Sequence, residues 1–346
     1  MARRKGAEIA AGAVLAAALA AGASGQEKGG EGMALIELTN GTVVVGVIPP
    51  LGGRVVLLKT AGGENLLDSD PKRWKPPYAR PAIETPFQPW NGRIVWVGPQ
   101  SGFWSQQDLK PELKTAKAPW PPDPFNETGR FDVVEKTTTL LKLKGATSPV
   151  TGLALEHEYE ITGERTVRMK TTATNGRETP VSWDLWPNTR VRPEGHPYVS
   201  PDPMQMLRME GPPLTDGDAR AYPSEIRGGW LTLPPGKKPE SGARRLWAKA
   251  YVRPSPGLIA YFLGQQLLVI RAPIVPRGKL HGEQAFIEVY RGAGKGVDTI
   301  LELEMHGPYE TLAPGASTSF EQTFEILDYD GPETTEGHVA RLEALR

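Results

Sequence analysis

The chain has 346 residues, with 40 lysines and arginines balanced by 40 aspartates and glutamates, and it contains no cysteine. The balanced charge argues against a nucleic-acid-binding protein, and the lack of cysteine excludes disulfides, a thiolate nucleophile and cysteine metal ligands. The 34 prolines and 39 glycines indicate many turns between short strands rather than disorder, because 39% of the residues are still hydrophobic. The length allows one large all-β domain or two ordinary domains.

The first 25 residues have the three parts of a secretory signal peptide. Three basic residues at positions 3–5 precede an alanine-rich apolar run at 9–21, and small residues at 21–23 suit cleavage. The apolar run is too short and too weakly hydrophobic for a membrane-spanning helix, and no other run is long enough. We expect export to the periplasm or the extracellular space with loss of residues 1–25, and a single domain at 26–346. A disordered N-terminal tail is the alternative.

From residue 34 the sequence has the pattern of short antiparallel strands. Residues 34–38 and 42–48 are predicted to be strands joined at Asn40-Gly41, a dipeptide typical of tight hairpins, and residues 54–59 a third strand.

Residues 68–132 are different, because they are rich in proline and tryptophan and have a strand pattern only at 93–97. An irregular segment of this length is usually disordered or functional. Its five tryptophans need a place to be buried, which favours long loops folded across a sheet face. Tryptophans stacked on sugar rings would suit this composition, although core packing is the commoner use of the residue.

The strand pattern returns at residue 131 and continues almost to the C-terminus. Within residues 152–162 His157 falls on the apolar face, so we interpret it as a hydrogen-bonded core residue. Residues 336–345 form the only predicted helix. The other predicted strands are 131–136, 137–144, 165–175, 181–189, 205–208, 230–233, 246–252, 257–263, 266–272, 284–290, 299–304 and 317–327.

The stretch 299–320 carries the strongest chemical signal. Leu301, Leu303 and Met305 alternate on one face of a predicted strand, and the opposite face carries Glu302, Glu304 and His306. Alternate residues on one face lie about 7 Å apart, so these groups are close enough to act together. The face is either solvated or lines a cup.

Familiar catalytic motifs are missing from the sequence. It contains no phosphate-binding loop, no dinucleotide-binding glycine motif, no GxSxG and no HExxH. Five histidines argue against a histidine-rich metal centre, so we predict no metal and no cofactor, although His281 or His306 with Glu283 or Glu304 would provide ligand types. What remains is carboxylate chemistry, with Glu304 as the candidate base and His306 as the nearest candidate acid.

Four segments together resemble the galactose mutarotase-like superfamily of aldose 1-epimerases and related sugar-binding domains. Residues 40–67 are similar to its first hairpin and Gly-Gly-Arg segment, and residues 91–104 to its glycine-rich loop. Residues 172–191 resemble its mid-chain site strand, and residues 301–317 resemble the late strand that carries the general base. The resemblance covers about residues 33–327. Within that superfamily, the tryptophan- and proline-rich segments resemble a secreted, functionally uncharacterised bacterial branch.

The resemblance implies one large all-β supersandwich with long Trp/Pro-rich loops, a short C-terminal helix and a sugar site on the concave sheet face. It places Glu304 at the position of the general base. The mid-chain strand lacks the histidine that aldose 1-epimerases use as the acid, and offers Asp184 and Trp186 instead. The side chains expected to line the sugar site, apart from Glu304 and His306, are Arg93, Trp96, Trp186, Asn188 and Arg291.

We therefore predict an exported carbohydrate-binding or carbohydrate-modifying protein. Two alternatives are a non-catalytic envelope protein that binds protein partners through its loops, and an aldose 1-epimerase with a substituted general acid. The expected partner is a carbohydrate ligand, with no nucleic acid. The sequence does not decide which sugar is bound, whether a reaction is catalysed, or the oligomeric state.

Overall fold

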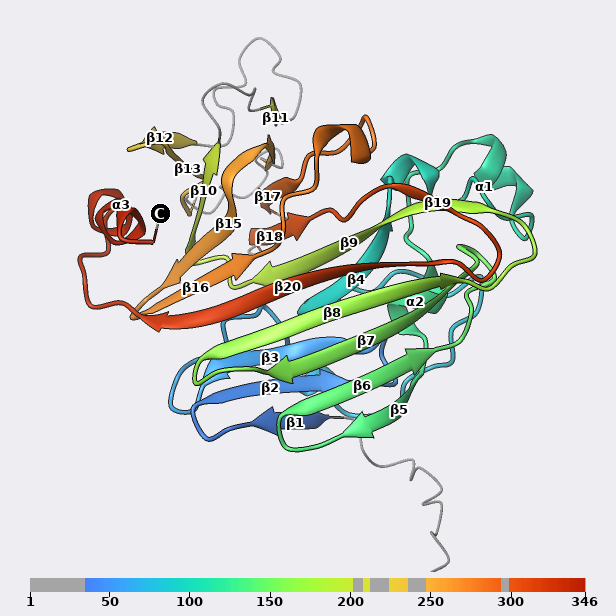
Figure 1. The fold of residues 1–346 in the computed structure, drawn as a ribbon, viewed down its shortest axis with the longest axis horizontal. Helices are drawn as coiled ribbons and strands as arrows, with labels where there is room; N and C mark the ends of the chain where they lie inside the picture. Colours follow the sequence, from blue (N-terminus) through green and yellow to red (C-terminus); the bar gives the residue numbers. More distant parts are fainter. Residues whose placement is uncertain (1–34, 202–207, 212–223, 236–246, 294–298, 346) are drawn as a thin grey trace, which may run out of the picture. The chain divides into compact units, whose positions relative to one another are not determined.

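Two antiparallel β-sheets, each of ten strands, make up the part of the chain that the structure describes (Figure 1). This computed structural model describes residues 35–201, 208–211, 224–235, 247–293 and 299–345. The predicted signal peptide and the predicted strand residues 205–207 lie outside these ranges. The all-β prediction is confirmed, because the described residues form only three short α-helices: α1 (Pro111–Thr115), α2 (Pro124–Thr128) and α3 (Thr335–Glu343). None of them is long and apolar enough to cross a membrane.

The two sheets draw their strands from distant parts of the sequence. The first sheet contains, in spatial order, β1 (Ile36–Thr39), β2 (Val43–Ile48), β3 (Arg54–Thr60), β4 (Arg93–Gly98), β9 (Val181–Val191), β18 (Thr299–Met305), β17 (Ile287–Ala293), β14 (Trp247–Val252) and β11 (Arg208–Glu210), with β19 (Glu310–Leu312) paired to the start of β9. The second sheet contains β12 (Glu225–Arg227), β13 (Trp230–Thr232), β10 (His196–Pro201), β15 (Pro254–Leu263), β16 (Gln266–Arg271), β20 (Ser317–Asp328), β8 (Thr166–Asn175), β7 (Leu153–Ile161), β6 (Leu140–Gly145) and β5 (Phe131–Lys136).

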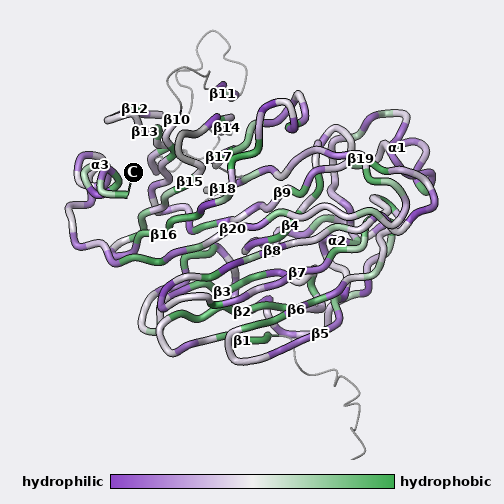
Figure 2. Tube along the Cα trace, in the orientation of Figure 1, coloured by the Kyte–Doolittle hydropathy of each residue, from purple (hydrophilic) through white to green (hydrophobic). Residues whose placement is uncertain are grey.

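Side chains that meet between the two sheets form the main hydrophobic core. Leu301, Leu303 and Met305 of β18 lie in it and are at most 1% exposed, as the alternation predicted. His157 is also buried, and its Nδ1 lies 2.9 Å from Thr171 Oγ1, which confirms the core interpretation. In Figure 2 hydrophobic residues recur along β1 to β3 and along β16. We call the side of each sheet toward this core its inner face, and the opposite side its outer face.

The proline- and tryptophan-rich segment 68–132 folds across the outer face of the first sheet, as predicted. Phe103 and Trp104 pack in one hydrophobic cluster with Trp96 of β4 and Trp186 of β9. A second cluster joins aromatic residues of the segment to β2 and β3, namely Trp74, Tyr78 and Trp90 with Ile48 and Val56. The sequence analysis did not predict α1 and α2, because each has only five residues, too few to show a helical pattern. Each of them begins at a proline, which suits the first turn of a helix.

The turn between β2 and β3 anchors this segment to the sheet. Gly52 has a φ of +70°, and its backbone N–H donates to the carbonyl oxygen of Gly129 at 2.8 Å. A Cβ atom on Gly52 would lie 2.6 Å from Asn126 O and 2.7 Å from Glu127 O, so only glycine allows this approach to α2. Immediately after the turn, Arg54 Nη2 lies 2.6 Å from Glu127 Oε2 and fixes α2 against β3.

A Gly52→Ala variant should lower the free energy of unfolding by at least about 2 kcal/mol, because it combines a left-handed backbone penalty with a clash against α2. Gly315→Ala is the matched control, since Gly315 has a φ of +74° but nothing within 4 Å of an added Cβ. The control should cost only about 1 kcal/mol. Chemical denaturation measures both losses, and equal losses would contradict the close approach.

Candidate functional site

Polar and aromatic side chains cover the outer face of the first sheet on five neighbouring strands, β4, β9, β18, β17 and β14. Strand register arranges them in rows across the sheet. One row contains Ile94, Asn188, Glu304, Glu288 and Tyr251. The next row contains Arg190, Glu302, Tyr290 and Lys249. Trp96 pairs with Trp186 in a third row.

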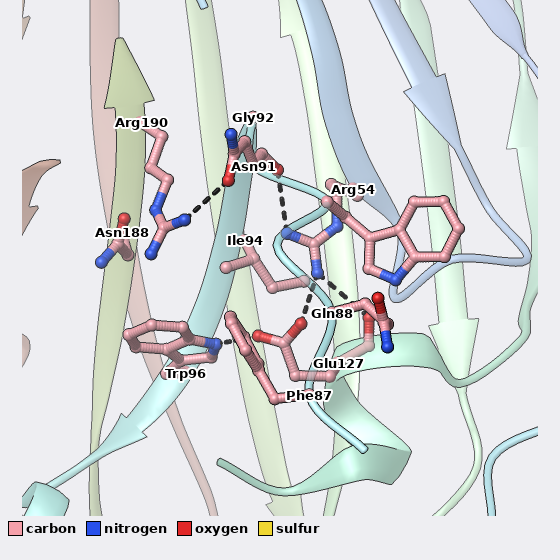
Figure 3. A pocket seen from close by; sticks show the side chains of 11 residues that line it. Arg54, Phe87, Gln88, Asn91, Gly92, Ile94, Trp96, Glu127, Asn188 and Arg190 are labelled. Atoms are coloured by element: carbon pink, nitrogen blue, oxygen red, sulfur yellow. Dashed lines mark hydrogen bonds and ion pairs between the residues drawn. The ribbon is translucent and has the colours of Figure 1, made fainter. Parts of the chain in front are cut away.

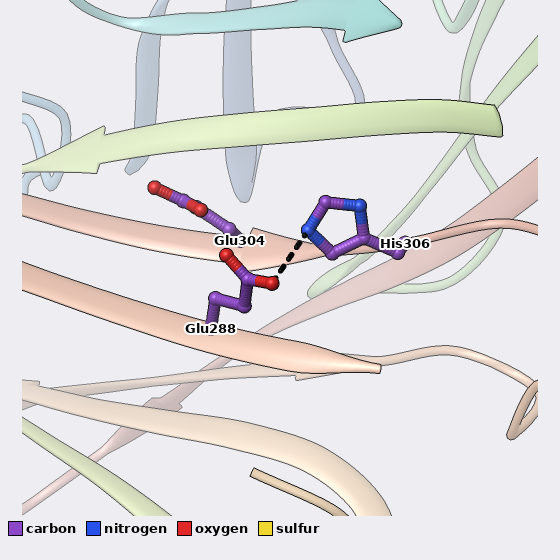
Figure 4. Close-up of side chains that lie close together, drawn as sticks. All are labelled: Glu288, Glu304 and His306. Atoms are coloured by element: carbon purple, nitrogen blue, oxygen red, sulfur yellow. Dashed lines mark ion pairs between the residues drawn. The ribbon is translucent and has the colours of Figure 1, made fainter. Parts of the chain in front are cut away.

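Lys249 lies between two buried carboxylates. Its Nζ is 2.6 Å from Glu288 Oε2 and 2.9 Å from Glu304 Oε2, and these side chains are only 2% and 1% exposed. Glu288 also accepts the backbone N–H of Ala285 at 3.0 Å. We refer to Asp184, Lys249, Glu288, Glu304 and His306 as the Glu304 cluster; Figure 4 shows three of its members.

His306 is fully buried within the cluster. Its Nδ1 lies 2.9 Å from Asp184 Oδ2, and its Nε2 lies 3.4 Å from Glu288 Oε1 (Figure 4). Burial acts to lower the pKa of His306, but the charge of Glu288 and the hydrogen bond with Asp184 raise it to about 9. The imidazole is therefore protonated at neutral pH and is directed at carboxylates on both sides.

The two glutamates of the cluster have opposite pKa shifts. Burial raises the pKa of Glu304 to about 7, and the nearby Glu302 and Glu288 add to the effect of burial although Lys249 opposes it. Burial also acts to raise the pKa of Glu288, but Lys249 and His306 together lower it to about 2. Glu304 can therefore accept a proton near neutral pH while Glu288 stays ionised, which is a separation that acid–base chemistry uses.

Indole and amide groups surround the carboxylate of Glu304. Trp186 Nε1 donates to Glu304 Oε2 at 3.1 Å, and Asn188 Nδ2 donates to Glu304 Oε1 at 3.4 Å. The Trp186 ring lies 5.1 Å from the His306 ring and 5.3 Å from the Trp96 ring, measured between centroids. The late strand and the tryptophans of β4 and β9 therefore meet on one face.

A small pocket lies on the same face and is partly lined by Asn188 (Figure 3). Its cavity volume is about 10 Å³, room for about one water molecule. Asn188 lines this pocket and also donates to Glu304, so the pocket and the cluster are neighbours. The pocket is lined by Arg54, Phe87, Gln88, Trp90, Asn91, Gly92, Ile94, Trp96, Glu127, Asn188 and Arg190.

The sequence matches the family DUF4380, described as a domain of unknown function, over residues 33–327. The chain belongs to the DUF4380 family. A comparison with curated proteins returns no match.

Solved structures place this DUF4380 chain among galactose mutarotase-like folds. The Slr1438 protein from Synechocystis sp. PCC 6803 is 13% identical, with a TM-score of 0.52, covering 84% of this chain and 95% of its own. A galactose mutarotase-like protein from Lactobacillus casei ATCC 334 is also 13% identical, with a TM-score of 0.50 and coverage of 85% and 100%. The GalM/aldose epimerase homologue from C. elegans has a TM-score of 0.47, 12% identity and coverage of 86% and 99%. The first two likenesses support the fold predicted from the sequence.

The structure brings five of the predicted site residues together on the outer face. Glu304, His306, Trp186 and Asn188 are in direct contact, and Trp96 packs against Trp186. All five are at most 7% exposed. Their part in binding or catalysis stays a prediction.

Arg93 and Arg291 do not reach this face, which corrects their predicted place in the site. Both are buried on the inner face, because they follow the same alternation as core residues of β4 and β17. Arg93 Nη2 donates to Gln322 Oε1 at 2.9 Å, and Arg291 Nη2 donates to the carbonyl oxygen of Gly195 at 2.6 Å. Neither arginine is carried into the functional proposal.

Sequence reasoning missed Lys249 and Glu288 and gave Asp184 no role. The signal was present in the alternation of β14 and β17, where Lys249 stands between two alanines and Glu288 between isoleucine and valine. A charged residue that alternates with core residues must project from the outer face. The sequence alone does not say that β14 and β17 are neighbours of β18.

Glu288, Glu304 and His306 are the one group of metal-ligating residues found in the described ranges, with ligand atoms within 4.8 Å of one another. His281 and Glu283, also considered from the sequence, take no part in this group. The ammonium group of Lys249 lies 2.6 and 2.9 Å from the two glutamates, so both carboxylates already have a cationic partner within the chain. Lys249 therefore supplies positive charge where a bound metal ion would otherwise supply it.

Glu304 and Glu288 should give opposite pH dependences of stability. The pKa of Glu304 rises from 4.5 to about 7 on folding, so the folded state binds the extra proton. The stability of the wild type relative to Glu304→Gln should therefore fall between about pH 4.5 and 7, by about 3 kcal/mol. Folding lowers the pKa of Glu288 from 4.5 to about 2, so the ionised carboxylate stabilises the folded state at pH values above about 4.5. That contribution should be lost as the pH falls toward about 2.

Unfolding in denaturant at a series of pH values measures these differences. Glu288→Gln serves as the paired variant, because it should differ from the wild type most at high pH and least in acid. If both variants followed the wild type in parallel from pH 2 to 8, the assigned protonation states would be wrong.

Proposed function

We propose that this protein is exported and binds or modifies a carbohydrate on the outer face of the first sheet. The observation that carries the proposal is the carboxylate of Glu304, which lies among Trp186, Asn188 and Lys249 beneath the aromatic loop segment. The fold likeness to a galactose mutarotase-like protein supports a sugar as the ligand class, and the signal-peptide pattern of residues 1–25 supports export.

The side chains at this position suit the chemistry of a sugar. A sugar ring presents apolar C–H faces that pack on an indole, and its hydroxyls donate to carboxylates and accept from amide and ammonium groups. Trp186 and Trp96 provide indoles, and Asn188, Lys249 and Glu304 provide the polar partners. Lys249 is 14% exposed and is therefore the member of the Glu304 cluster that a ligand reaches first.

A sugar ring is larger than the one-water pocket beside Asn188, so binding requires the covering loop to move. Phe87 and Trp90 are partly buried at that pocket and Gln88 is exposed. Residues 87–90 belong to no strand, so their displacement would open the pocket toward Trp96 and Asn188 while strand pairing in the sheet is kept. In this proposal the loop closes over the bound sugar and excludes water from Glu304.

Calorimetric titration with a panel of monosaccharides and oligosaccharides tests the proposal. Glu304→Gln and Trp186→Phe should each weaken binding about tenfold or more, because each removes a hydrogen-bonding group from the site. Glu158→Gln, on β7 of the second sheet, is the control and should bind like the wild type. No binding at millimolar sugar, or binding indifferent to both substitutions, would contradict the proposal and favour the protein-partner alternative.

Aldose 1-epimerase activity is the second candidate function, favoured by the pKa of Glu304 near 7 and by the ammonium group 2.9 Å away. Glu304 would take the proton of the anomeric hydroxyl as the bond between C1 and the ring oxygen breaks. Lys249 or His306 would give a proton to that oxygen, and the reverse steps would close the ring on the other face. His306 is fully buried, so Lys249 is the acid within closer reach of a ligand.

Polarimetry on freshly dissolved α-glucose or α-galactose decides this candidate. An epimerase should exceed the buffer blank, and Glu304→Gln should lower the rate about 10²–10⁴-fold. Lys249→Met should lower it in the same range if Lys249 is the acid. A wild-type rate equal to the blank would exclude the epimerase and leave sugar binding.

A further inference from the structure

Trp120 is the one exposed tryptophan of the chain. All nine tryptophans lie in the described ranges, and the other eight are buried or partly buried. Trp120 is 42% exposed. Single hydrophobic side chains are common on protein surfaces, but tryptophan is the largest of them and is enriched at binding surfaces. The residues around Trp120 indicate which role it has.

The backbone on both sides of Trp120 is held by two other side chains. Gln100 Nε2 donates to the carbonyl oxygen of Pro119 at 3.0 Å, and Trp104 Nε1 donates to that of Pro121 at 2.8 Å. The proline rings fix φ at both of these positions, so the short stretch has little conformational freedom. An exposed indole on such a backbone loses little entropy when a ligand packs on it.

Trp120 is the outer member of a row of aromatic rings that leads to Glu304. Its ring centroid lies 6.2 Å from that of Trp96, and the Trp96 centroid lies 5.3 Å from that of Trp186. Trp186 in turn donates to Glu304 at 3.1 Å. Exposure falls along the row, from 42% at Trp120 to 7% at Trp96 and 3% at Trp186. One ring therefore separates the exposed indole from the indole that contacts the candidate base.

Phe87 connects Trp120 to the loop that covers the pocket. The Phe87 and Trp120 rings pack edge to face with their centroids 4.6 Å apart, and Phe87 and Trp96 both line the pocket (Figure 3). Residues 87–90 are those that must move to admit a sugar in the proposed function. A ligand group that replaces Phe87 on the Trp120 ring would therefore also open the pocket toward Trp96 and Asn188.

We propose that Trp120 is the platform of a second sugar subsite, so that the ligand is an oligosaccharide rather than a single sugar. The inference rests on the proposed function and names its substrate class. One unit of the saccharide would lie at Trp186 and Asn188, and a neighbouring unit would pack its C–H face on the Trp120 indole. A single sugar held at Glu304 would leave that indole in water.

Calorimetric titration of the full chain with sugars of two lengths tests the proposal. The matched pairs are glucose with cellotetraose, galactose with galactotetraose and mannose with mannotetraose, so that each pair shares its repeating unit. The tetrasaccharide should bind about fivefold or more tightly than its monosaccharide, because the second unit gains an aromatic contact.

Two variants of Trp120 separate the aromatic face from simple packing. Trp120→Leu keeps an apolar side chain against Phe87 but offers no flat ring, so it should bring the ratio of the two dissociation constants to about one. Trp120→Phe keeps a ring and should retain most of the tetrasaccharide preference. Quenching of tryptophan fluorescence by acrylamide gives a second readout, since bound tetrasaccharide should protect Trp120 in the wild type and this protection should be absent in Trp120→Phe.

Leu109→Ala is the matched control, because Leu109 is 52% exposed on the same covering segment but is not part of the hydrophobic cluster at Trp96 and Trp186. It should keep the wild-type ratio. A tetrasaccharide that binds no more tightly than its monosaccharide, or a ratio that Trp120→Leu leaves unchanged, would overturn the platform while sugar binding stands. If no member of any pair binds, the proposed function fails and the platform fails with it.

Discussion

The ammonium group of Lys249 is what allows two carboxylates to lie buried side by side on the first sheet. Glu288 and Glu304 stand directly opposite each other on neighbouring strands, where like charges repel, and removing an ionised carboxylate from water costs several kcal/mol. Lys249 contacts both carboxylates and so offsets both penalties. The remaining asymmetry between the two glutamates comes from His306, which pairs with Glu288 at 3.4 Å and with Asp184 at 2.9 Å. Glu288 therefore stays ionised, and Glu304 remains able to exchange a proton near neutral pH.

The covering segment 68–132 provides the burial on which these shifted pKa values depend. It is attached to the sheet by the turn at Gly52, by the ion pair of Arg54 with Glu127, and by Trp96 Nε1, which donates to Glu127. The same contacts build the small pocket beside Asn188. The electrostatics of the Glu304 cluster and the shape of the pocket are thus two consequences of one packing arrangement, so a change at the α2 anchor would affect both.

The candidate site could be predicted from the sequence in part. The alternation of β18 predicted that Glu304 and His306 share a face, and the resemblance to galactose mutarotase-like proteins added Trp96, Trp186 and Asn188. Arg93 and Arg291 were misplaced because a charged residue in a strand was assigned to the ligand face. Their guanidinium groups are instead accommodated on the inner face by Gln322 and by the carbonyl oxygen of Gly195. Whether a charge can be buried depends on partners that lie far away in the sequence.

The sequence by itself determined the all-β class, the strand alternation, the hairpin turns and the covering aromatic segment, because side-chain periodicity and turn residues act over a few neighbouring positions. Only the tertiary structure decided which strands are adjacent. It brought Lys249 of β14 and Glu288 of β17 beside Glu304 of β18, and it placed Arg54 and Trp90 around one pocket. These groups are separated by 16 to 55 positions in the chain. Local pattern carries no information about such pairing, because it arises from strand order and from the packing of one sheet against its covering loops.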